Sequence, residues 1–142
     1  MRGPLVHVPN PLRPSPFVDT LASMVGPEYR VLSIGLRNAC AYQVQADHIT
    51  GVLAQFGFAA PVLVGEGLGS AAALLVAAWS PGGVGALILV DAVYQAEGET
   101  LAARALRECP PDVTLLRQAI RCRVLETTAS ADEIKAFLLT LV

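Results

Sequence analysis

The chain has 142 residues, of which 54% are hydrophobic and 15% are charged, and its formal net charge is -2. This length suits one domain with one core and is too short for two, so we expect a single domain over residues 1–142. The 10 basic residues are scattered, so the charge pattern gives no indication of nucleic-acid binding. The high apolar fraction favours a largely buried sheet or an apolar surface that associates with another chain.

Apolar runs, the first residues and the cysteine spacing indicate where the protein is located and whether it binds a metal. The longest uninterrupted apolar run covers residues 71–79, whereas a membrane span needs roughly 18 apolar residues or more, so no membrane segment is expected. The first residues contain an early proline and no long apolar segment, which argues against a secretory signal and makes the cytoplasm the expected location. Cys40, Cys109 and Cys122 lack the spacing of a zinc site or a disulfide framework. We therefore expect reduced thiols and neither metal nor cofactor.

Strands and helices alternate along the chain. Short runs rich in Val, Ile and Leu predict five strands, at residues 5–8, 30–36, 61–65, 86–91 and 122–127. Apolar residues at i, i+3 and i+4 predict helices at residues 17–25, 42–56, 68–79, 99–107, 113–120 and 131–141, with Asp112 and Ser130 as N-caps of the last two. Continuously apolar strands connected by helices predict an α/β fold with a doubly wound, mainly parallel five-stranded sheet.

A glycine-rich turn lies between the third predicted strand and the helix after it. Residues 62–70 read VLVGEGLGS, and the sequence GEGLG resembles the G-x-S-x-G nucleophile elbow of the α/β-hydrolase superfamily. Residues 5–8, 28–37, 47–57 and 86–92 resemble the family's flanking strands and helix in the same order. The resemblance implies a truncated α/β-hydrolase-like domain that begins at the family's third strand and stops after the seventh.

The serine chemistry of that family is altered in three places. Gly67 stands where the family has its nucleophilic serine, and glycine relieves the backbone strain of the turn. The catalytic histidine of the family follows a final strand, but His7 and His48 both precede the turn. The resemblance implies an oxyanion donor at the Leu68 N–H and a second donor at Pro9, which has no N–H. A Ser-His-Asp hydrolase mechanism is therefore set aside for this protein, and the Asn10 amide is a candidate replacement donor.

Three ionisable residues are predicted near the turn, each with a structural alternative. Glu66 lies beside the lost nucleophile at a helix N-terminus, where it could act as a general base or only stabilise the helix. Asp91 follows the next strand, where some family members carry the triad acid, or it forms a turn. His7 ends a central strand close to the site, or it is a structural histidine. We take Glu66, His7 and Asp91 as the candidate catalytic residues.

Further residues are predicted to line a pocket at the same edge of the sheet. Asn10 and Tyr94 follow the first and fourth predicted strands, and Gln95 and Glu97 continue the second of these loops. Cys40 follows the second strand and is either a replacement nucleophile or a small buried thiol.

The favoured function is acyl transfer without an acyl-serine intermediate. The donor would be an acyl carrier protein thioester or a small acyl substrate, because an activated thioester needs little beyond orientation and a partial oxyanion donor. By size and type, the chain is similar to acyl-transfer proteins of natural-product assembly, such as the indolyl-transfer step of nosiheptide-type thiopeptide pathways. The alternative is a non-catalytic pseudohydrolase that binds a ligand or partner, and a third possibility is an esterase that uses Cys40. The last predicted strand would form an open sheet edge, so we expect a homodimer through that edge or the last helix, or a complex with a partner.

Overall fold

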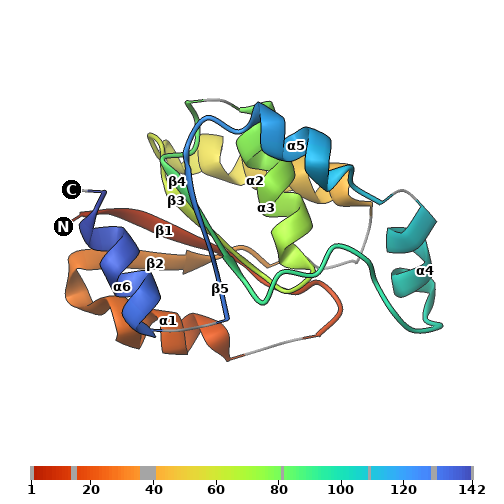
Figure 1. Cartoon of the computed structure of the whole chain (residues 1–142), viewed down its shortest axis with the longest axis horizontal. Helices are drawn as coiled ribbons and strands as arrows, with labels where there is room; N and C mark the ends of the chain where they lie inside the picture. The colour runs from red at the N-terminus through yellow and green to blue at the C-terminus, as the bar shows by residue number, and fades with distance from the viewer. Residues whose placement is uncertain are drawn as a thin grey trace.

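The structure is a computed structural model that describes residues 2–13, 16–35, 41–80, 82–108, 110–128 and 131–141. A single five-stranded sheet runs through its centre, with helices packed on both faces (Figure 1). Within the described residues, no helix is long and apolar enough to cross a membrane.

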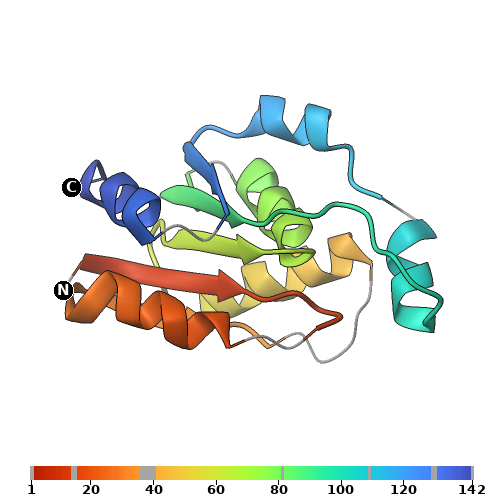
Figure 2. The same cartoon turned by 60° about the horizontal axis from the view of Figure 1, so that its bottom comes forward.

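The sheet is parallel throughout and has the strand order β2-β1-β3-β4-β5. Its strands are β1 (Arg2–Val8), β2 (Tyr29–Ser33), β3 (Val62–Glu66), β4 (Ala86–Val90) and β5 (Arg123–Thr127). Because all strands point the same way, their carboxyl ends and the loops that follow them meet at one edge (Figure 2). Ligands of open α/β sheets bind at this edge.

The helices form two layers. One face of the sheet carries α2 (Tyr42–Phe56), α3 (Gly69–Trp79) and α5 (Val113–Ala119), and the other carries α1 (Phe17–Val25) and α6 (Ala131–Leu139) (Figures 1 and 2). A short 3-10 helix, η1 (Gly26–Glu28), follows α1. The helix α4 (Leu101–Glu108) lies beyond the carboxyl ends of the strands, where it borders the candidate site.

Two apolar clusters form the core, one on each face of the sheet. Alternate residues of β1 divide between them, so that Val6 and Val8 face α2 and α3 whereas Leu5 faces α1 and α6. The helix α3 is buried on every side from Gly69 to Ala78, which explains why it is apolar all round and rich in alanine.

The sequence-based elements agree closely with the structure. The α/β class, the parallel five-stranded sheet and the edge position of β5 are confirmed. Asp112 caps α5 by accepting a hydrogen bond from the Leu115 N–H at 3.1 Å, whereas Ser130 lies outside the described residues. The predicted strand at 30–36 was too long, because β2 ends at Ser33, and the strand at 86–91 ends one residue early, at Val90.

Candidate functional site

Two glycines, Gly65 and Gly69, lie where the turn between β3 and α3 packs too closely for a side chain. A Cβ on Gly65 would lie 2.8 Å from Ser70 Cα, and a Cβ on Gly69 would lie 2.3 Å from the Val8 carbonyl oxygen and 2.4 Å from that of Pro9. Side chains at these positions would collide with backbone, which cannot easily move. The glycines therefore allow α3 to begin directly against β3 and against the end of β1.

Gly67 occupies the apex of this turn and has a left-handed backbone, with φ of +54°. Its N–H donates to the Val90 carbonyl at 3.0 Å, and its own carbonyl accepts from the Val93 N–H at 3.1 Å. A Cβ on Gly67 would lie 2.9 Å from Asn10 Nδ2. The Asn10 amide thus occupies the space beside the position at which a nucleophilic side chain would begin.

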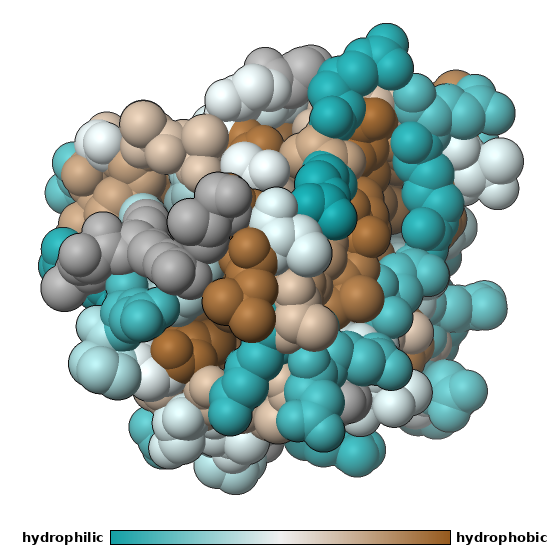
Figure 3. Space-filling view, turned by 60° about the vertical axis from the view of Figure 1, so that its left-hand side comes forward, coloured by the Kyte–Doolittle hydropathy of each residue, from teal (hydrophilic) through white to brown (hydrophobic). Residues whose placement is uncertain are grey.

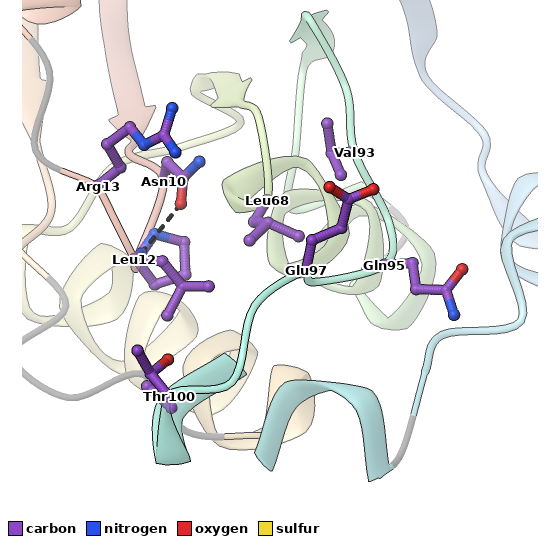
Figure 4. Close-up of a pocket in the computed structure, with 10 residues that line it drawn as sticks. Asn10, Leu12, Arg13, Leu68, Val93, Gln95, Glu97 and Thr100 are labelled. Carbon is purple, nitrogen blue, oxygen red and sulfur yellow. Dashed lines mark hydrogen bonds between the residues drawn. The ribbon is translucent and has the colours of Figure 1, made fainter. Parts of the chain in front are cut away.

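Asn10 is oriented by its own loop. Its Oδ1 accepts a hydrogen bond from the Leu12 N–H at 2.9 Å (Figure 4). The Nδ2 end of the amide is thereby left on the side of Gly67. No hydrogen bond from the Leu68 N–H to another described residue is found, as is usual for a group at the start of a helix. Two N–H donors, one from a side chain and one from the backbone, therefore lie at the turn.

A cleft of about 780 Å³ opens beside these donors. The loop after β1 forms one wall with Asn10, Leu12 and Arg13, the loop after β4 and the start of α4 form the other, and Leu68 lies between them (Figure 4). The second wall consists of Val93, Gln95, Glu97, Thr100 and Ala102. The cleft is mixed in character, with apolar side chains, one cation and one carboxylate.

His7 and Glu66 form a direct hydrogen-bonded pair on the opposite face of the sheet. His7 Nε2 lies 2.9 Å from Glu66 Oε1, and His7 Nδ1 lies 2.8 Å from Ser33 Oγ. Parallel register explains the arrangement, since His7 pairs with Ser33 on β2 and with Val64, two residues before Glu66, on β3. The Phe17 ring of α1 packs 5.6 Å from the imidazole, centroid to centroid.

The imidazole of His7 is 1% exposed, and burial lowers its pKa below the ordinary value. The hydrogen bond and the charge of Glu66 oppose that shift but do not reverse it. His7 is therefore neutral at neutral pH. A carboxylate only accepts hydrogen bonds, so the proton lies on Nε2 toward Glu66, and Nδ1 accepts from the Ser33 hydroxyl.

The other predicted site residues lie apart from this pair. Asp91 is exposed with φ of +48°, its N–H donates to the Thr127 carbonyl, and it is not among the residues that line the cleft. The Tyr94 hydroxyl lies 3.5 Å from Arg117, so its neighbours Val93 and Gln95 line the cleft in its place. Cys40 falls outside the described residues.

Two residues near the candidate site were not predicted from the sequence. Arg13 is a cation on the cleft wall in a proline-rich loop that showed no motif. Ser33 ends an apolar strand, and only the strand register places its hydroxyl on His7. Within the described residues, no group of three or more His, Cys, Asp or Glu side chains is arranged to hold a metal ion.

Comparison with solved structures finds α/β hydrolases. The crystal structure of MGS-MChE2, an alpha/beta hydrolase enzyme from the metagenome of lagoon sediments at Mar Chica, Morocco, is 15% identical with a TM-score of 0.72, over 97% of this chain and 89% of that one. A candidate lipase (lip1) from Acinetobacter baumannii AYE is 11% identical with a TM-score of 0.65, over 99% and 84%. No family model and no curated protein matches the sequence. The chain thus has an α/β-hydrolase-like fold. It covers most of the length of both neighbours, so the comparison does not confirm the predicted truncation.

Proposed function

We propose that this protein of α/β-hydrolase-like fold transfers an acyl group directly from a thioester to an acceptor bound beside it. The observation that carries the proposal is the turn at Gly67, where the Asn10 amide lies 2.9 Å from the position of a Cβ and stands in place of a nucleophile. A site with hydrogen-bond donors and no nucleophile is suited to stabilise a carbonyl oxygen during attack by an external group.

The cleft supports a two-substrate reaction. Its volume of about 780 Å³ is in the range of pockets that hold a ligand of moderate size, and an acyl or aryl group would fit against Leu12, Leu68 and Val93. Arg13 at the wall suits a phosphodiester such as the one in the arm of a carrier protein. A carrier-protein thioester is therefore the donor that we favour over a free acyl ester.

The reaction needs few groups from the protein. An acceptor thiolate attacks the thioester carbonyl carbon, and negative charge develops on the carbonyl oxygen, where Asn10 Nδ2–H and Leu68 N–H donate hydrogen bonds. The tetrahedral species collapses, the carbon–sulfur bond to the donor breaks, and the donor leaves as a thiolate. Because a thiolate both enters and leaves, no proton has to be supplied by a residue in the cleft.

Glu66 and His7 then act by positioning the turn rather than by touching the acyl group. The carboxylate of Glu66 is committed to His7 on the face covered by α1, away from the cleft. Their hydrogen bond links the carboxyl end of β1 to that of β3, from which the loops carrying Asn10 and Leu68 begin. Asp91 lies at the end of the adjoining strand, and we assign it no contact with the substrate.

The proposal is tested with an acyl or aryl thioester of a carrier protein, a thiol acceptor and product detection by mass spectrometry. Asn10→Asp is the informative variant, because its carboxylate still accepts from the Leu12 N–H while the donor beside Gly67 is lost. We expect transfer to fall by about 10²-fold, the usual loss for one oxyanion donor. Gln55→Glu, which makes the reverse exchange of amide and carboxylate at an exposed position of α2 outside the cleft lining, is the control and should leave the rate unchanged.

Absence of transfer above the uncatalysed rate by the wild-type protein would contradict the proposal and leave a binding role. Equal rates for the wild-type and Asn10→Asp proteins would contradict the assignment of the donor.

A further inference from the structure

Ser33, His7 and Glu66 form a second chemical arrangement, and none of the three side chains lines the cleft. An exposed hydroxyl contacts a buried imidazole at 2.8 Å, and the same imidazole contacts a carboxylate at 2.9 Å. A nucleophile within hydrogen-bond reach of a base, with the base oriented by a third group, is the general signature of an activated nucleophile. Such arrangements are recognised by geometry and role rather than by order in the chain.

The protonation pattern suits a base. Glu66 holds the proton of His7 on Nε2, so the lone pair of Nδ1 faces the hydroxyl of Ser33. The Phe17 ring packs against the imidazole of His7, which is 1% exposed, whereas Ser33 on the other side of Nδ1 is exposed. The carboxylate is 15% exposed and would stabilise the imidazolium that forms during proton transfer.

We propose that Ser33, His7 and Glu66 form a nucleophile–base–carboxylate triad, separate from the turn at Gly67, that hydrolyses small activated esters. Ser33 Oγ attacks the carbonyl carbon while its proton passes to His7 Nδ1. The tetrahedral intermediate collapses, and the leaving alkoxide takes that proton from His7. Water then attacks the acyl-serine through the same base, the carboxylic acid leaves, and Ser33 and neutral His7 are restored.

The position of Ser33 leaves its hydroxyl accessible. Ser33 is exposed at the end of the edge strand β2, and its hydroxyl lies on the face of the sheet that α1 covers, where it contacts His7. The apolar groove of about 210 Å³ that Leu32, Ile34 and Phe56 line lies on the other face, against α2. A small activated ester that reaches the exposed hydroxyl from solvent is therefore the substrate class that we assign.

The test is covalent labelling with a fluorophosphonate. In this reaction Ser33 Oγ forms a bond to phosphorus, fluoride leaves, and the proton goes to His7. We expect mass spectrometry of the digested protein to locate the adduct on Ser33, and Ser33→Ala to abolish it along with hydrolysis of 4-nitrophenyl butyrate. Ser23→Ala is the matched control, because Ser23 is an exposed serine on α1 with no histidine contact given by the structure.

Glu66→Gln tests the positioning role of the carboxylate. The carboxamide oxygen can still accept from His7 Nε2–H, so the fold should persist, but the imidazolium loses its counter-charge. We expect labelling of Ser33 to slow at least about tenfold at an unchanged unfolding midpoint, within the range of base catalysis. No adduct on Ser33, or labelling of Ser33 no faster than that of Ser23, would overturn the proposal. Because Asn10→Asp leaves this triad intact, failure here and failure of acyl transfer are distinguishable.

Discussion

At the scale of single residues, Gly67 and Asn10 are coupled. The left-handed φ of Gly67 and the short distance from its Cβ position to Asn10 Nδ2 mean that a serine there needs two changes, one in backbone energy and one in the neighbouring side chain. The local packing therefore disfavours any side chain at position 67. A substitution to serine at this position also requires Asn10 to move.

We predict that Gly67→Ser and Gly67→Ala each lower the free energy of unfolding by about 1–3 kcal/mol, because a non-glycine residue is strained at this φ. Denaturant unfolding measures the loss. In an Asn10→Ala background the cost should be smaller, since the displaced side chain is gone, and a double-mutant cycle reports the difference. Unchanged stability in either single variant would contradict this account.

His7 predicts a pH dependence of stability. Its folded pKa is lowered by burial, whereas in the unfolded chain it is near the ordinary value of about 6.5. Below that value the unfolded state binds the proton first, so the contribution of His7 is present above about pH 6.5 and is lost as pH falls toward the folded pKa. The groups that contact the ring are the Glu66 carboxylate, the Ser33 hydroxyl and the Phe17 ring.

The measurement is urea unfolding at pH 5 and pH 8 for the wild-type protein and for His7→Asn. The wild-type protein should gain more stability between the two pH values than the variant does. Equal gains would mean that His7 titrates alike in the folded and unfolded chains.

At the scale of elements, the β3–α3 junction sets the site. Gly69 lies against two backbone carbonyl oxygens, while Gly51 in α2 is exposed with no atom near its Cβ position. We predict that Gly69→Ala destabilises the fold by about 3 kcal/mol or more, because backbone must move. Gly51→Ala should stabilise it by about 0.5–1 kcal/mol through helix propensity. Thermal unfolding compares the two, and similar shifts for both would contradict the packing at Gly69.

Elements were more predictable than contacts between them. The apolar runs predicted the strands and the helical spacing predicted the helices, because each of these patterns is local in the sequence. The helices α1 and α2 have the predicted bounds. The contact of His7 with Ser33 and Glu66 spans 26 and 59 residues and depends on strand register, which no local pattern contains. The packing of Asn10 against Gly67 likewise depends on how the loop after β1 returns over the turn.

At the scale of the whole molecule, the outer strands β2 and β5 each pair on one side only within the part of the chain that the structure describes. Val124 on β5 is 37% exposed and Leu139 on α6 is 65% exposed. Figure 3 shows apolar surface between hydrophilic side chains on the side of the molecule on which α6 lies. An unpaired edge beside apolar surface favours association with a second strand.

We predict a homodimer formed through β5 and α6. The Val124→Lys substitution places a charge on the edge strand β5 and should shift the dimer to monomer. Size-exclusion chromatography with light scattering measures the mass of both proteins. A wild-type protein that remains monomeric at high concentration would contradict the prediction.

If the acyl group passes directly between two bound substrates, the initial-rate pattern of transfer will show it. The rate is measured in the Ser33→Ala protein, so that the Ser33 hydroxyl cannot carry the acyl group. The concentrations of the thioester and of the thiol acceptor are both varied. Direct transfer predicts intersecting double-reciprocal lines and no acylated protein by intact mass. Parallel lines with an acylated protein, the pattern of a covalent intermediate, would contradict the account.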